Sequence, residues 1–206
     1  PATIGNIGPG FDVLGLAVKG LGDIVEARKV PEGVVIESIE NADHEISMKA
    51  DENTAGIAAR EVLKLLSLNG GVELKIKKGL PSGSGLGSSA ASAAAAAFAT
   101  NHLYGEKLSK ADLILPATKA EEYVSGGFFA DNTAPCLLGG ATLTRSKLPF
   151  DVTKIGHIDN LRIILVTPDV IVLTREAREM LPDTVSLDGF INNMANSCLI
   201  SAAFAK

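Results

Sequence analysis

A glycine-rich turn between a strand pattern and a helix pattern constrains this chain most. The turn reads Pro81-Ser-Gly-Ser-Gly-Leu-Gly-Ser-Ser-Ala-Ala-Ser92. Residues 72–77 alternate as a strand does, and residues 88–104 are rich in alanine and predict a helix. A helix N-terminus offers free backbone N–H groups and a partial charge of roughly half an electron, which favour an anion. Glycines 83, 85 and 87 let the backbone approach a ligand closely. The turn therefore predicts a binding site for nucleotide phosphate.

Two common phosphate loops do not fit the turn. A Walker loop requires a lysine after its last glycine, and no lysine follows Gly87. A dinucleotide fingerprint requires a third glycine where Ser88 stands. The hydroxyls of Ser88 and Ser89 are suited to capping the helix or to reaching a metal ion. A glycine-rich turn in which a serine merely caps a buried helix therefore stays an alternative.

Composition limits the classes of partner. The chain has 206 residues, of which 46% are apolar and 21% charged, as is typical of a globular protein. A net charge of −5 argues against nucleic acid or an anionic membrane as a partner. The longest uncharged stretch, 79–102, contains too much Gly, Ser and Ala for a membrane span. We therefore expect small-molecule partners, no nucleic acid, no membrane and a cytoplasmic location.

Periodicity predicts a β-rich first part followed by helices. The expected strands are 24–30, 34–39, 45–49, 72–77, 141–145 and 161–167. The expected helices are 54–68 with an Asn53 cap, 88–104, 109–124 opened by Ser109 and bent at Pro116, 174–181, and 187–205 capped by Ser186. Residues 147–160 are expected to form a loop that holds a domain boundary.

Four blocks of the sequence resemble one enzyme family. Pro81 to Ala90 matches the Pro-x3-Gly-Leu-Gly-Ser-Ser-Ala motif of the GHMP kinases. Within that superfamily, residues 1–17, 130–140 and 174–182 resemble blocks of the homoserine kinases. The resemblance implies an α+β fold of two domains. Residues 1–155 would form an ATP-binding domain like ribosomal protein S5 domain 2, and 156–206 the incomplete start of a ferredoxin-like domain. Because the third motif of the family is absent, we expect a fragment.

The resemblance also implies an activity. Homoserine kinases use ATP and Mg2+ to phosphorylate the side-chain hydroxyl of L-homoserine, which gives O-phospho-L-homoserine for threonine biosynthesis. The resemblance allows a homodimer. Two alternatives stay open: a GHMP kinase for another small alcohol, and a catalytically silent protein that binds a nucleotide or metabolite.

Site residues for ATP and Mg2+ follow from the same resemblance. The implied ATP-binding residues are Asn53, Pro81, Gly83, Ser84, Gly85, Leu86, Gly87, Ser88 and Ser89. The resemblance points to Ser88 and Glu121 for the metal, with Glu122 as the competing carboxylate. By itself Glu121 would be a solvated helix residue, and Asn53 remains equally well explained as a helix cap.

A second set of residues is implied for the amino acid. Asn6, Asp12, Asp131 and Arg178 would bind it, and Asn132, Thr174 and Arg178 would be catalytic. Asn132 stands where mevalonate-type relatives carry an aspartate proposed as a base. Because an amide cannot accept the hydroxyl proton, the resemblance implies catalysis by alignment, with the γ-phosphate or solvent as proton acceptor. Many homoserine kinases have histidine where this chain has Phe129.

Overall fold

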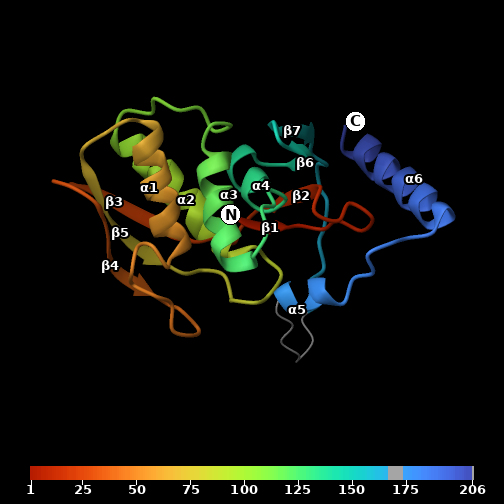
Figure 1. Ribbon diagram of the computed structural model, residues 1–206, viewed down its shortest axis with the longest axis horizontal. Helices are drawn as coiled ribbons and strands as arrows, with labels where there is room; N and C mark the ends of the chain where they lie inside the picture. Colours follow the sequence, from red (N-terminus) through yellow and green to blue (C-terminus); the bar gives the residue numbers. More distant parts are fainter. Residues whose placement is uncertain (167–173, 206) are drawn as a thin grey trace.

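The elements of this α+β chain form two β-sheets and a central layer of helices, as Figure 1 shows. The structure is a computed structural model that describes residues 1–166 and 174–205. Figure 1 shows the helices α1 to α4 between a sheet of β3, β4 and β5 on one side and a sheet of β1, β2, β6 and β7 on the other. No helix within the described ranges is long and apolar enough to cross a membrane.

The first sheet is antiparallel and has the order β1-β2-β6-β7. Its strands are β1 (Ala2–Ile4), β2 (Leu14–Val18), β6 (Ala141–Lys147) and β7 (Phe150–Gly156). β1 and β2 come from the first block of the sequence, whereas β6 follows directly on the block at 130–140. The sheet therefore joins two blocks that lie more than a hundred residues apart in the chain.

The second sheet has the order β3-β5-β4, in which β5 is antiparallel to β3 and parallel to β4. Its strands are β3 (Ile24–Val30), β4 (Val34–Glu40) and β5 (Gly71–Lys77). The helices of the central layer are α1 (Thr54–Leu65), α2 (Ser88–Leu103), α3 (Ile114–Ser125) and α4 (Thr133–Leu138). The parallel crossover from β4 to β5 runs through α1.

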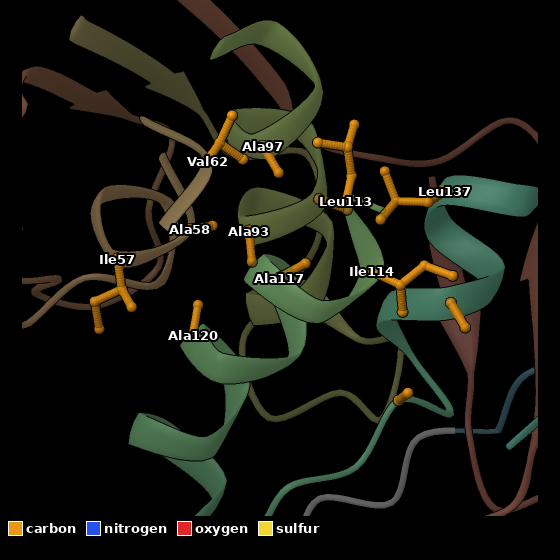
Figure 2. Close-up of a cluster of buried hydrophobic side chains, with 13 residues drawn as sticks. Ile57, Ala58, Val62, Ala93, Ala97, Leu113, Ile114, Ala117, Ala120 and Leu137 are labelled. Carbon is orange, nitrogen blue, oxygen red and sulfur yellow. The ribbon is translucent and has the colours of Figure 1, made fainter. Parts of the chain in front are cut away.

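Small side chains let α2 lie in the middle of this layer. Figure 2 shows Ala93 and Ala97 of α2 in one cluster with Ala58 of α1 and Ala117 of α3. Ala96 of α2 belongs to a second cluster, formed with apolar residues of β4, β5 and α1. Because α2 packs against other elements on two sides, the packing positions its first turn, where the glycine loop ends.

The C-terminal elements contact the same body at its first block and first sheet. They are α5 (Thr174–Glu179) and α6 (Leu187–Phe204), the second of which lies at the far edge of Figure 1. Phe204 is buried against Leu16 of β2 and Ala141 of β6. The Ser197 hydroxyl donates a hydrogen bond to the Pro9 carbonyl at 3.0 Å. As expected, Ser186 caps α6 by accepting from the Gly189 N–H.

Two expected strands are wrong. Residues 45–49 form no strand, because local hydrogen bonds before α1 occupy their polar groups. Within them the Ser47 hydroxyl accepts from the Lys49 N–H, and the Ser47 carbonyl accepts from the Asn53 amide. The apolar run 161–166 is also irregular and has no strand partner among the described residues, and residue 167 of that prediction lies outside them.

Two further expectations are wrong at their boundaries. The helix expected at 109–124 begins only at Ile114, because Ser109 and Asp112 form a separate hydrogen-bonded turn. Pro116 therefore lies in the first turn of α3, where a missing N–H breaks no helical hydrogen bond, and it does not bend the helix. The loop expected at 147–160 contains β7, which pairs with β6.

Candidate functional site

The glycine loop has the conformation that a phosphate cradle requires. Gly83, Gly85 and Gly87 have φ values of 63°, 72° and 65°, in the region that favours glycine. Gly87 is the N-cap of α2, and no side chain caps this helix. The alternative of a serine that only caps the helix is therefore wrong. The first N–H groups of α2 have no intrahelical partner and remain suited to an anion.

Three distant segments meet at Gly87. The Thr3 hydroxyl of β1 donates to the Asn132 Oδ1 atom at 2.9 Å. A Cβ atom at position 87 would lie 2.2 Å from the Thr3 hydroxyl and 2.9 Å from Asn132 Oδ1. At Gly5, a Cβ atom would lie 2.2 Å from Asp131 Oδ2 and 2.8 Å from Asn132 Nδ2. Glycine at these two positions therefore leaves room for the carboxylate and the amide beside the loop.

The serines at the start of α2 point to different partners. The Ser88 hydroxyl donates to the Leu80 carbonyl at 3.1 Å. The Ser89 hydroxyl donates to Glu121 Oε2 of α3 at 3.0 Å. The structure thus places Ser89, rather than Ser88, in contact with Glu121. The competing carboxylate, Glu122, is exposed.

Burial changes the acidity of two carboxyl groups here. Glu121 is 9% exposed, and burial raises its pKa to about 7, with the charge of Asp131 adding to the effect. Asp131 is 4% exposed, and burial together with the charge of Asp12 raises its pKa to about 6. The Ser89 hydroxyl opposes the first shift, and backbone N–H groups and Arg178 oppose the second. A cation bound at either carboxyl group would favour its charged form and lower its pKa.

A buried ion pair supports the loop from behind. Lys78, which directly follows β5, pairs with Asp23, and both side chains are almost fully buried. The Lys78 ammonium also donates to the Ser88 carbonyl at 3.0 Å and to the Ser92 hydroxyl at 2.8 Å. This network fixes the start of α2 against β5. Sequence reasoning missed it, although a lysine directly before the loop was a usable signal.

The side chains expected to bind an amino acid lie together on the first block and α5. Arg178 forms a two-pronged ion pair with Asp12, in which Nη1 lies 2.9 Å from Oδ2. This pairing raises the pKa of Arg178. The Asp12 N–H donates to Asn6 Oδ1 at 2.8 Å, and both residues have positive φ, at 60° and 54°. The charges of Asp12 and Arg178 shift the pKa of Asp131 in opposite directions, so Asp131 lies within electrostatic range of this pair.

Two further residues expected in the site are Asn53 and Thr174. Asn53 caps α1, because its side chain accepts from the Ala55 N–H at 2.9 Å. The next residue, Thr54, donates to the Ser89 carbonyl at 3.2 Å, so the start of α1 contacts the start of α2. An additional contact of Asn53 with adenine stays a prediction. The side chain of Thr174 lies outside the described residues.

Sequence comparison connects these segments to known proteins. Residues 53–140, which hold α1 to α4 and the glycine loop, match the family described as GHMP kinases N terminal domain. A homoserine kinase of Methanococcus maripaludis is 40% identical over 197 residues, which are 96% of this chain and 65% of that protein. A homoserine kinase of Arabidopsis thaliana is 41% identical over 210 residues, 98% of this chain and 56% of that protein.

Residues 53–140 form a GHMP kinase N-terminal domain.

Solved GHMP kinase structures agree with the fold. The crystal structure of a homoserine kinase from Cytophaga hutchinsonii has a TM-score of 0.89 and 38% identity, and the match covers 100% of this chain and 65% of that one. The mevalonate kinase structure from Methanococcus jannaschii has a TM-score of 0.57 at 16% identity, which shows the GHMP fold alone. The chain therefore spans less than two thirds of the length of these relatives.

The residues at the glycine loop fit Mg2+. Ser89 and Glu121 provide a hydroxyl and a buried carboxylate, which are the oxygen donors that hard cations prefer. Within the described ranges, no group of three or more His, Cys, Asp or Glu side chains is arranged to hold a metal ion. Mg2+ commonly takes one or two protein oxygens and completes its shell with water and substrate phosphate, so the pair of Ser89 and Glu121 would supply enough protein donors.

Proposed function

We propose that the protein is an ATP-dependent kinase that phosphorylates the side-chain hydroxyl of L-homoserine. The observation that carries this proposal is the contact of Asn132 with Thr3 beside Gly87. Asp131, the residue before Asn132, lies within electrostatic range of the ion pair of Asp12 and Arg178. A phosphate cradle and a set of charges suited to an amino acid therefore adjoin one another.

The loop would hold the phosphates of ATP. Backbone N–H groups at the uncapped start of α2 favour phosphate oxygens, and Gly83, Gly85 and Gly87 allow close approach of the backbone. Ser89 and Glu121 would hold Mg2+, whose charge would stabilise the phosphate oxygens when it is bound. The Ser88 hydroxyl donates its proton to the Leu80 carbonyl, but its oxygen still has lone pairs that could bind a metal ion. A metal contact of Ser88 therefore stays a prediction.

The charged residues would position the amino acid. Asp131 and Asp12 are acceptors for an α-ammonium group, and Arg178 is a donor for an α-carboxylate. Asn6 orders the segment that carries Asp12 through its bond to the backbone. Such a site needs both charges of an α-amino acid, and a sugar or a simple alcohol would leave Asp131 and Arg178 without ligand partners.

Transfer then requires alignment more than acid–base chemistry. The homoserine hydroxyl oxygen forms a bond to the γ-phosphorus, the bond from that phosphorus to the bridging oxygen breaks, and ADP leaves. The hydroxyl proton passes to a phosphate oxygen or to solvent, because the amide of Asn132 cannot accept it. Thr3 fixes the Asn132 amide, so this side chain is suited to hold the acceptor in line.

A coupled ADP-release assay tests the proposed function. The protein expressed from its complete reading frame is supplied with MgATP and, in parallel, L-homoserine, mevalonate, galactose and shikimate. We expect turnover with L-homoserine and a kcat/KM for it that exceeds the others by at least about 100-fold, as expected where charged partners are left unpaired. Preference for another alcohol would show a different GHMP kinase. Binding of ATP without turnover of any acceptor would show a silent binding protein.

A further inference from the structure

Phe129 lies between two cationic side chains. The guanidinium carbon of Arg178 lies 3.8 Å from the centre of the Phe129 ring. The ammonium group of Lys147, at the end of β6, lies 3.9 Å from the same centre. Both distances are well within the range in which an aromatic ring attracts a cation. The ring thus contacts one cationic side chain from α5 and one from the first sheet.

The position of this ring is fixed by its neighbours. A Cβ atom at Gly127 would lie 2.0 Å from Phe129 Cε2, so the ring packs directly against that glycine. The preceding side chain, Phe128, makes an edge-to-face contact with Phe150 of β7 at 5.4 Å between ring centres. Phe128 therefore anchors the segment to the first sheet, and Phe129 is left to contact the cations.

The two cations differ in their acidic partners. Arg178 is paired with Asp12, whereas no ion pair of Lys147 occurs within the described part of the chain. The Nε atom of Arg178 is buried and has no hydrogen-bond acceptor among the described residues. A buried donor without a partner is unfavourable, and it is relieved when an acceptor binds. The vicinity of the ring thus lacks one anionic acceptor.

We propose that Phe129 and Lys147 determine specificity for the acceptor, by forming with Arg178 a subsite for the carboxylate of an amino acid. The ring holds the guanidinium group of Arg178 in place, and Lys147 supplies the second positive charge. The proposal rests on the proposed function and adds the two residues that select the carboxylate.

Steady-state kinetics of the protein from its complete reading frame test the subsite. Phe129→Leu removes the ring and should raise the KM for L-homoserine about three- to tenfold, the range of a partly desolvated cation–π contact, with the KM for ATP unchanged. Phe129→Tyr keeps the ring and should recover most of that affinity. Lys147→Met should raise the same KM about threefold and reduce its dependence on salt, because one screened charge is lost. Lys147 is exposed, so this variant does not depend on packing of the ring.

Two analogues and a control variant show whether the carboxylate is the group involved. 4-Hydroxybutanoate keeps the carboxylate, so Phe129→Leu and Lys147→Met should lower kcat/KM for it by the same factor as for L-homoserine. 3-Aminopropan-1-ol lacks the carboxylate, so its kcat/KM should be the same in the two variants as in the wild type. Lys110 stands over the ring of Phe98 elsewhere in the molecule, so Lys110→Met removes the same kind of contact and should match the wild type.

The outcomes separate the two proposals. If the wild type phosphorylates L-homoserine but both variants keep its KM, or if 3-aminopropan-1-ol suffers the same losses, the subsite is wrong and the proposed function stands. If the wild type has no activity with L-homoserine, the proposed function itself is wrong.

Discussion

The pH dependence of stability should reveal Glu121 as a carboxyl group that burial keeps protonated. Its pKa is about 7 in the folded protein and would be near the ordinary 4.5 in the unfolded chain. Between these values the folded state holds a proton that the unfolded state has released, so stability falls as the pH rises. A difference of 2.5 pKa units corresponds to about 3 kcal/mol, most of which should be lost between pH 5 and pH 8.

Glu121→Gln removes this titration and keeps the shape of the side chain. The amide oxygen can still accept from the Ser89 hydroxyl, so the contact to α2 should persist. We expect the stability of the variant relative to wild type to increase by roughly 2 to 3 kcal/mol from pH 5 to pH 8. The buried carboxyl of Asp131 titrates in both proteins, and its effect largely cancels in this difference.

Urea unfolding followed by circular dichroism measures the effect. Both proteins are unfolded at half-unit steps of pH, in EDTA so that no divalent cation stabilises the carboxylate. Glu122→Gln is the matched control, because its exposed side chain lies one residue away on α3. Free-energy curves of wild type and Glu121→Gln that run parallel from pH 5 to pH 8 would refute the reasoning, as would an equal effect of Glu122→Gln.

Three further predictions concern catalysis. Ser89→Ala should lower kcat about 10- to 100-fold and raise the KM for ATP by a smaller factor, because Ser89 contacts Glu121 directly. Ser88→Ala should also lower kcat. A larger loss of kcat in Ser88→Ala than in Ser89→Ala would assign the metal contact to Ser88. Arg178→Lys keeps the charge but loses the two-pronged geometry, so the KM for L-homoserine should rise about tenfold or more in initial-rate assays; an unchanged KM would exclude Arg178 from the site. If the proposed function is correct, Asn132→Asp places an anion beside the transferring phosphoryl group, and its kcat should be lower than that of wild type across a pH–rate series. A variant faster than wild type above pH 7 would show that a base was missing.

Local patterns predicted the helical layer well. Alanine content placed α2 within one residue of its observed end, and Asn53 and Ser186 are the caps that their positions suggested. The end of α2, the two caps and the glycine loop all depend on residues that are close in sequence. The resemblance added the remaining site residues, which no local pattern would have joined to the loop.

Contacts between distant segments could not be predicted. β1 and β2 are short and lie in a block rich in glycine, and they form strands because β1 pairs with β2 and β2 pairs with the distant β6. The bond from Thr3 to Asn132 joins residues 129 positions apart. The choice between Ser88 and Ser89 is equally non-local, because adjacent residues of a helix point about 100° apart and only the packing of α3 shows which one meets Glu121.

Phosphorus NMR of the reaction tests the central claim most directly. The protein from its complete reading frame is incubated with ATP, Mg2+ and L-homoserine, and the spectrum is followed over time. We predict that the γ-phosphate signal of ATP is replaced by a phosphomonoester signal coupled to the side-chain methylene protons of homoserine, with ADP in equal amount, and that Glu121→Gln slows its appearance. Consumption of ATP that yields only ADP and inorganic phosphate, or no consumption with L-homoserine, would contradict the account.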